Sequence, residues 1–146
     1  MNGHAELAQI WPRDGRLRLV GRLHGHDPAD EKAEWELLLV HREDPARRLR
    51  YRAPLEGAAF DVACPVEDLA PERLELPAVW DLYLTRDPEA DPAGALRLGR
   101  HLDDIEGKKK IMVFPPQSVV RPAGKAAVRP YYTIRDNLSV EVTPAP

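Results

Sequence analysis

The sequence has little cysteine: Cys64 is its single one, so no internal disulfide can form. That scarcity agrees with a reducing compartment and leads us to expect a cytoplasmic protein. No apolar run approaches the roughly 20 residues of a membrane-spanning helix, so we expect no transmembrane segment. The stretch from Met1 to Ile10 lacks a basic region followed by an apolar run, and it therefore predicts no signal peptide.

A strong excess of charge of one sign is lacking too. The net charge is -3 over 146 residues, and both signs are mixed along the chain. Nucleic-acid-binding domains usually have a basic patch or stripe, so we expect no nucleic-acid partner. A length of 146 residues fits one domain, and we expect a single domain over 1–146 with its core at about 8–143.

The short motifs of the common enzyme classes are also absent. The sequence has no phosphate-binding loop, no dinucleotide fingerprint and no paired zinc motif. Neither Ser118 nor Ser139 lies in a G-x-S-x-G elbow. Cys64 ends a row of alternating apolar residues, which favours a core position over a nucleophile. We therefore expect a non-enzyme with no catalytic residue, no cofactor and no metal ligand set.

What is present is a pattern of short alternating segments. The 15 prolines and nine glycines are spread along the chain, which suits short strands joined by turns better than long helices. The clearest segment is Ala78–Arg86, where Trp80, Leu82 and Leu84 alternate with polar residues. A period of two is typical of a half-buried strand, so we expect this strand to lie across the core.

Other segments show the same period. In Arg16–Leu23 leucines alternate with arginines, which predicts a strand with one solvated face. Lys32–Val40 is rich in helix formers but also alternates, and we favour a strand because its neighbours on both sides are strands. The remaining predicted strands are 8–12, 48–52, 58–64, 96–98, 111–114, 128–134 and 138–142. We expect a helical turn at Val66–Leu69, a surface loop at Gln117–Lys125 and a tight turn at Asp136-Asn137.

Eight or so short strands with regular turn signals predict an all-β fold. The expected architecture is an immunoglobulin-like, fibronectin III-like antiparallel β-sandwich with Greek-key connections. In such a sandwich we expect Trp35 and Trp80 to meet across the core. The disulfide of an antibody domain is absent because there is one cysteine.

Two groups of residues have the chemistry of a metal or acid–base site. A His-x-His spacing can place two imidazoles on one side of a strand, and carboxylates follow it. The first group comprises His24, His26, Asp27 and Asp30, and the second comprises His101, Asp103 and Asp104. The first group lacks a third or fourth ligand at a recognisable spacing, and the second would need a pocket and a shifted pKa to act in acid–base catalysis. A solvated polar loop is the favoured interpretation of both groups.

Two further features could contact a ligand. Lys108, Lys109 and Lys110 could bind an anion, although acidic neighbours offset their charge and such runs are usually solvated turns. Trp11 and Tyr131, with Tyr132, could form an aromatic surface for sugar rings. Packing inside the core is the favoured alternative for these aromatic side chains.

Several segments resemble an accessory domain of actinobacterial transferases. The matching stretches are Val79–Leu84, Arg97–Ile105 followed by Lys108–Lys110, and Arg129–Val140. The family comprises CDP-glycerol glycerophosphotransferase-like and glycosyltransferase proteins linked to teichoic-acid-type cell-wall polymers. The resemblance implies a β-sandwich module of a longer transferase chain, outside the catalytic domain. No catalytic residue of the family has a counterpart here.

The resemblance further implies that the partners are a catalytic transferase domain or a cell-wall polymer. It implies a cytoplasmic location, at the inner membrane face through the parent enzyme. Two other functions compete with this accessory role. One is a stand-alone interaction protein whose sheet edge pairs with a partner strand. The other is a small enzyme or metal protein built on His24, His26 and His101, which requires these histidines to converge.

Overall fold

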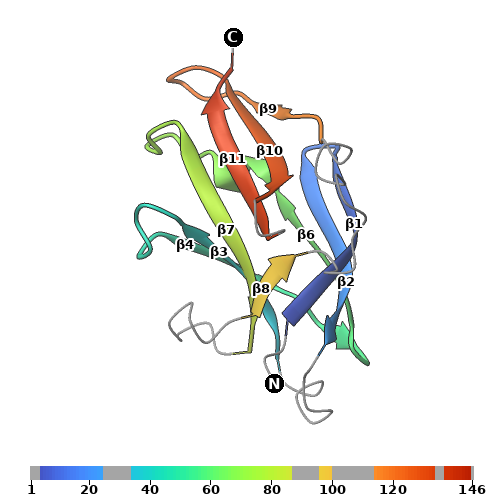
Figure 1. The fold of residues 1–146 in the computed structure, drawn as a ribbon. Helices are drawn as coiled ribbons and strands as arrows, with labels where there is room; N and C mark the ends of the chain where they lie inside the picture. Colours follow the sequence, from blue (N-terminus) through green and yellow to red (C-terminus); the bar gives the residue numbers. More distant parts are fainter. Residues whose placement is uncertain (1–3, 25–33, 87–95, 100–113, 134–136, 146) are drawn as a thin grey trace.

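The computed structural model describes residues 4–24, 34–86, 96–99, 114–133 and 137–145. These residues form eleven strands and one short 3-10 helix, η2 (Val66–Leu69), and no α-helix is found among them. The strands build two β-sheets that pack face to face around a common apolar core (Figure 1). The all-β sandwich expected from the alternating patterns is therefore confirmed.

One sheet, here called sheet A, contains the first strands of the chain. Its strands lie in the order β5-β6-β2-β1, and each neighbouring pair is antiparallel. They are β1 (His4–Arg13), β2 (Arg16–His24), β5 (Leu55–Glu56) and β6 (Ala59–Pro65). The predicted alternation holds in β2, where Leu17, Leu19 and Leu23 are buried while the arginines between them are exposed.

The second sheet, sheet B, is built around β7. Its strands lie in the order β4-β3-β7-β11-β10-β9, again with antiparallel neighbours. They are β3 (Glu36–His41), β4 (Arg48–Arg52), β7 (Ala78–Thr85), β9 (Gln117–Val119), β10 (Ala126–Tyr132) and β11 (Leu138–Pro144). The expected central strand is thus confirmed, with Trp80, Leu82 and Leu84 in the core.

Strand β8 (Leu96–Gly99) connects the two sheets. It pairs with β7 through Arg97 opposite Tyr83, as expected for the return arm of a hairpin. Its last two residues, Leu98 and Gly99, run parallel to β1, opposite Ala5 and Glu6. This parallel pair departs from the antiparallel prediction, because β8 continues past β7 and reaches the edge of the other sheet.

Two tight contacts show how closely the core is packed. A Cβ atom on Gly21 of β2 would lie 2.0 Å from the Glu6 carbonyl oxygen and 2.8 Å from the Phe60 ring, so glycine is required there. On the other sheet, the Trp80 indole donates a hydrogen bond of 2.9 Å to the Leu69 carbonyl at the end of η2. The buried indole nitrogen is therefore satisfied.

The ambiguous segment Lys32–Val40 contains strand β3 from Glu36 onward, so the strand interpretation is confirmed over a helix. Trp35 is buried just before this strand. Since β3 and β7 are neighbours and Trp80 lies opposite His41, Trp35 directly precedes a strand of the sheet that contains Trp80. The expectation that they meet across the two sheets is therefore wrong.

A second correction concerns the loop predicted at Gln117–Lys125. Its first three residues form β9, whose pairing with β10 depends on partners that the local pattern does not specify. Phe114 lies outside any strand, whereas 111–113 and Asp136 of the predicted strand and turn lie outside the described residues. In the part of the chain described here, no helix is long and apolar enough to span a membrane.

Candidate functional site

Several candidate residues lie outside the part of the chain that the structure describes. They are His26, Asp27, Asp30, His101, Asp103, Asp104, Lys108, Lys109 and Lys110, and the side chain of His24 is not described either. Among the described residues, no group of three or more His, Cys, Asp or Glu side chains is arranged to hold a metal ion.

The two aromatic candidates lie on different sheets. Trp11 is on β1 of sheet A, and its side chain is 39% exposed. Tyr131 is on β10 of sheet B, half-buried and opposite Ser139 of β11. Tyr132 packs against the core. These residues therefore do not form one aromatic surface, and Trp11 and Tyr131 have to be considered separately.

Trp11 lies near the end of the β1–β2 hairpin, on the outer face of sheet A. A hollow of about 390 Å³ adjoins it, lined also by Arg13, Asp14, Arg16, Arg18 and Ala63. We call these six residues the Trp11 surface. The Arg13 guanidinium lies over the indole ring, 4.9 Å from its centroid, which is within the range of a cation–π contact.

The charges of the Trp11 surface are only partly neutralised by neighbours. Arg18 forms a two-point ion pair with Asp61 of β6, with nitrogen–oxygen distances of 2.9 and 2.5 Å. The hydrogen bond from Arg18 holds the pKa of Asp61 below its usual range. Arg13 lies 4.0 Å from Asp14, and both side chains are strongly exposed. Among the described residues, the Arg16 guanidinium has no ion-pair or hydrogen-bond partner.

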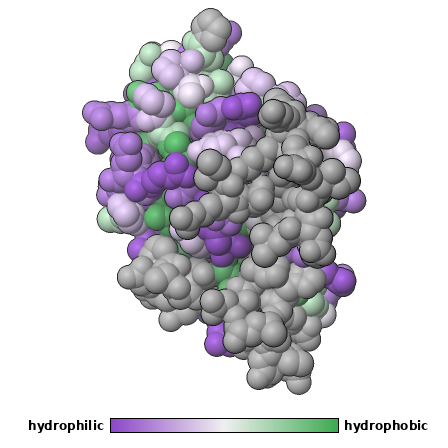
Figure 2. All heavy atoms as spheres, viewed as in Figure 1, coloured by the Kyte–Doolittle hydropathy of each residue, from purple (hydrophilic) through white to green (hydrophobic). Residues whose placement is uncertain are grey.

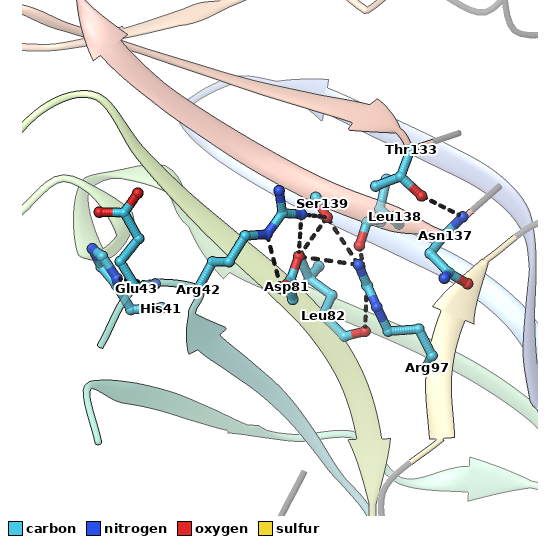
Figure 3. A network of polar contacts seen from close by, with 10 residues as sticks. All are labelled: His41, Arg42, Glu43, Asp81, Leu82, Arg97, Thr133, Asn137, Leu138 and Ser139. Carbon is cyan, nitrogen blue, oxygen red and sulfur yellow. Dashed lines mark hydrogen bonds and ion pairs between the residues drawn. The ribbon is translucent and has the colours of Figure 1, made fainter. Parts of the chain in front are cut away.

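The second cluster, which we call the Asp81 network, lies on the outer face of sheet B. It comprises Asp81 of β7, Ser139 of β11, Arg97 of β8 and Arg42, which follows β3 (Figure 3). The Asp81 carboxylate accepts hydrogen bonds from Arg42 (2.7 and 3.2 Å), Ser139 (2.7 Å) and Arg97 (3.1 Å). Residues from three strands and one turn thus converge on one carboxylate.

Burial sets the electrostatics of this network. The Asp81 side chain is 16% exposed and that of Arg97 is 21% exposed. Burial alone would raise the pKa of Asp81, but the hydrogen bonds from Arg42 and Ser139 and the two positive charges outweigh it and lower that pKa. Burial lowers the pKa of Arg97, against the opposing effect of Asp81. Both groups remain charged at neutral pH.

The donors of Arg97 are used within the protein. One terminal nitrogen donates to the Leu82 carbonyl at 3.1 Å and to the Leu138 carbonyl, and the other donates to Ser139 at 2.9 Å. The guanidinium also lies 5.3 Å from the centroid of the Tyr83 ring. With its donors directed at protein groups, Arg97 is suited to holding β7, β8 and β11 together.

Sequence reasoning placed Asp81 on the polar side of its strand but did not identify this network. A signal was present, because Asp81, Arg97 and Ser139 all occupy polar positions within alternating segments. The missing information was the order of the strands, which brings β11 and β8 to the same edge of β7.

On the face drawn in Figure 2, hydrophilic side chains are frequent over the described part, and hydrophobic ones form small separate areas. The described residues thus show no broad apolar docking face in this view.

Comparison with known proteins gives a fold relationship. The sequence matches no protein-family model and no curated protein. A crystal structure of S. aureus TarS is similar with a TM-score of 0.68 and 13% identity, over 97% of this chain and 25% of that chain. A structure of S. aureus TarS 217-571 gives 0.67 and 14%, over 100% of this chain and 40% of that one. The chain therefore shares a fold with a part of TarS and spans about a quarter of its length.

Proposed function

We propose that this chain is a non-catalytic accessory module of a cell-wall polymer transferase. The observation that carries the proposal is the fold likeness to TarS, a teichoic-acid glycosyltransferase. Nearly the whole chain, 97%, corresponds to only 25% of TarS, which leaves ample length in such an enzyme for a separate catalytic unit. The structural neighbours are structures of TarS and not of CDP-glycerol glycerophosphotransferase-like proteins, so that narrower family rests on the resembling sequence segments alone.

The chemistry of the described residues agrees with a role other than catalysis. Burial raises the pKa of the Cys64 thiol to about 12, so the reactive thiolate is scarce at neutral pH. In the Asp81 network, Ser139 donates its hydroxyl hydrogen bond to Asp81 and receives others from two arginines. Its oxygen is therefore engaged on both sides instead of being presented to a substrate.

The alternative of a stand-alone interaction protein depends on a sheet edge that can accept a partner strand. In the described part of sheet B, β4 is such an edge because it pairs with β3 alone. However, β4 has arginines at Arg48, Arg50 and Arg52. Charged side chains on edge strands oppose pairing with a further strand, so this observation favours the accessory role.

An assay for group transfer tests the proposal. The purified chain is incubated with UDP-N-acetylglucosamine or CDP-glycerol and a polyol phosphate acceptor, and the release of UDP or CDP is measured. A glycosyltransferase of known UDP-sugar donor serves as the positive control for the detection of UDP. We expect no release above that of buffer. Release of either nucleotide in proportion to the concentration of this chain would overturn the non-catalytic assignment.

A further inference from the structure

We propose that the Trp11 surface is a binding site for a phosphate-bearing glycan, in which a sugar ring packs on the indole and a phosphodiester contacts the arginines. The inference rests on the proposed function and deepens it by naming the ligand class and the residues.

The exposure of Trp11 is unusual within this protein. The other two tryptophans, Trp35 and Trp80, are buried in the core. The large hydrophobic residues that are exposed among the described ones are Trp11 and Val120. Trp11 lies opposite Arg18 on β2, in a row of outward-facing residues, so the indole is presented to solvent by the pleat of the strand.

The shape of the surface provides room beside the indole. On β6, the residue paired with Arg18 is Ala63, whose small side chain leaves space between Trp11 and the edge of the sheet. The hollow formed there measures about 390 Å³. This volume falls within the roughly 300–1,000 Å³ that small-molecule sites occupy, so one sugar unit with its phosphate can be accommodated.

The charge of the surface suits an anion. Arg13, Arg16 and Arg18 line the hollow, whereas Asp14 is the acidic residue that lines it. Arg18 is paired with Asp61, whereas Arg13 has a 4.0 Å contact to Asp14 and lies over one face of the Trp11 ring, so a sugar would pack on the indole beside it. Guanidinium groups hydrogen-bond phosphate oxygens through two parallel donors, so Arg13 and Arg16 are the groups we assign to the phosphodiester.

The hairpin that presents this surface is held in place by the other sheet. The Gln117 side chain of β9 accepts a hydrogen bond of 2.8 Å from the Gly15 amide and donates one of 2.8 Å to the Arg16 carbonyl. The Val66 amide also donates to the Gly15 carbonyl at 3.0 Å. Because the turn between β1 and β2 is fixed before binding, little conformational entropy is lost when a ligand contacts it.

The test uses the 146-residue chain and a glycerol phosphate oligomer substituted with N-acetylglucosamine. Binding is measured by isothermal titration calorimetry and by NMR, with the indole signal of Trp11 identified through its absence in Trp11→Phe. Three comparison ligands are an N-acetylglucosamine oligomer without phosphate, inorganic polyphosphate and a single-stranded oligonucleotide. We expect the substituted phosphate oligomer to bind most tightly and its affinity to fall with added salt.

The variants separate the two parts of the site. We expect Trp11→Ala to weaken binding about tenfold, as for aromatic stacking on other rings, and Trp11→Phe to retain most of the affinity. The double change Arg13→Ala with Arg16→Ala is expected to weaken binding and to reduce its dependence on salt. The matched control is Arg22→Ala. Arg22 is exposed on β2, the strand of Arg16, but lies outside the hollow, so this variant should bind like the wild type.

Three results would overturn the inference. The first is that the substituted oligomer does not bind detectably. The second is that the Trp11→Ala and double-arginine variants bind it as tightly as the wild type does. The third is that the phosphate-free glycan or the oligonucleotide binds more tightly than the substituted oligomer. None of these results contradicts the proposed function, because the result that would overturn it is the release of UDP or CDP. The NMR spectrum of each variant verifies its fold, and exposed positions such as these are expected to tolerate substitution.

Discussion

The outer faces of the two sheets use the same residue types for different purposes. On sheet B, Arg97 and Asp81 are largely buried and their hydrogen-bonding groups are directed at each other, at Ser139 and at backbone carbonyls. On sheet A, Arg18 and Asp61 form a shorter pair, at 2.5 Å against 3.1 Å for Arg97 and Asp81, yet both side chains are about half exposed. Burial and the completeness of the internal partners, more than residue type, therefore separate a structural contact from a surface available to ligands.

The largest expected effect on the free energy of unfolding is that of replacing Asp81, and replacing Asp61 is the comparison. Asp81→Ala removes the carboxylate from two arginines, one of which is mostly buried, and we expect a loss of about 3 kcal/mol in the free energy of unfolding. Asp61→Ala removes the partner of an exposed arginine, and we expect the urea midpoint to change little. Urea denaturation followed by tryptophan fluorescence measures both. Equal losses for the two variants would contradict the distinction between the faces.

A second prediction tests whether sheet A is merely more tolerant than sheet B. Gly21→Ala would place a Cβ atom 2.0 Å from the Glu6 carbonyl, so the backbone of β1 or β2 must move. Overpacking of this kind typically costs about 1–3 kcal/mol, and we expect a loss of about 2 kcal/mol. The measurement is the same urea titration. If Gly21→Ala left the free energy of unfolding unchanged, sheet A would tolerate substitutions even at a closely packed position. A small effect of Asp61→Ala would then no longer distinguish the two faces.

The strands that alternate strongly could be predicted from the sequence. In β7 and β2 the period of two extends over a whole strand, and the structure buries the side that the pattern indicates. By contrast, β9 has three residues, and the parallel pairing of β8 with β1 joins residues more than ninety positions apart. Neither feature leaves a local signal, because each depends on the tertiary arrangement and not on the neighbouring residues.

The clusters were predictable to different degrees for the same reason. Trp11 could be named as a candidate from its residue type alone, although packing inside the core is the alternative that the sequence favours and the residue is 39% exposed. The Asp81 network joins residues that are 39, 16 and 58 positions from Asp81, namely Arg42, Arg97 and Ser139. Only the strand order brings these together, so the polar pattern of β7 alone could not reveal it.

The third prediction concerns acid stability. The folded protein holds the pKa of Asp81 below its ordinary value of about 3.9, so between the two values the unfolded chain binds a proton that the folded chain does not. The free energy of unfolding should therefore fall as the pH decreases through this window, and the contribution of Asp81 should be complete above it. Asp81→Asn should show a shallower decline, measured by urea titrations from about pH 2 to 6.

The control for this experiment is Asp61→Asn, because the pKa of Asp61 is also lowered, by Arg18. The Asp61 side chain is 51% exposed and that of Asp81 is 16% exposed, so solvent screens the Asp61 pair more. We expect Asp61→Asn to flatten the decline less than Asp81→Asn does. An equal flattening would show that exposure does not discriminate between the two faces.

The smallest expected effect on stability belongs to Trp11. Trp11→Ala removes a cation–π contact with Arg13 and a hydrogen bond to Gln9 at an exposed position, so we expect a loss below about 1 kcal/mol. Trp80→Ala is the matched change in the core and should cost at least about 3 kcal/mol, because it leaves a cavity and frees the Leu69 carbonyl. If Trp11→Ala destabilised the protein as much as Trp80→Ala, the indole would be part of the fold and its exposure would no longer point to a ligand.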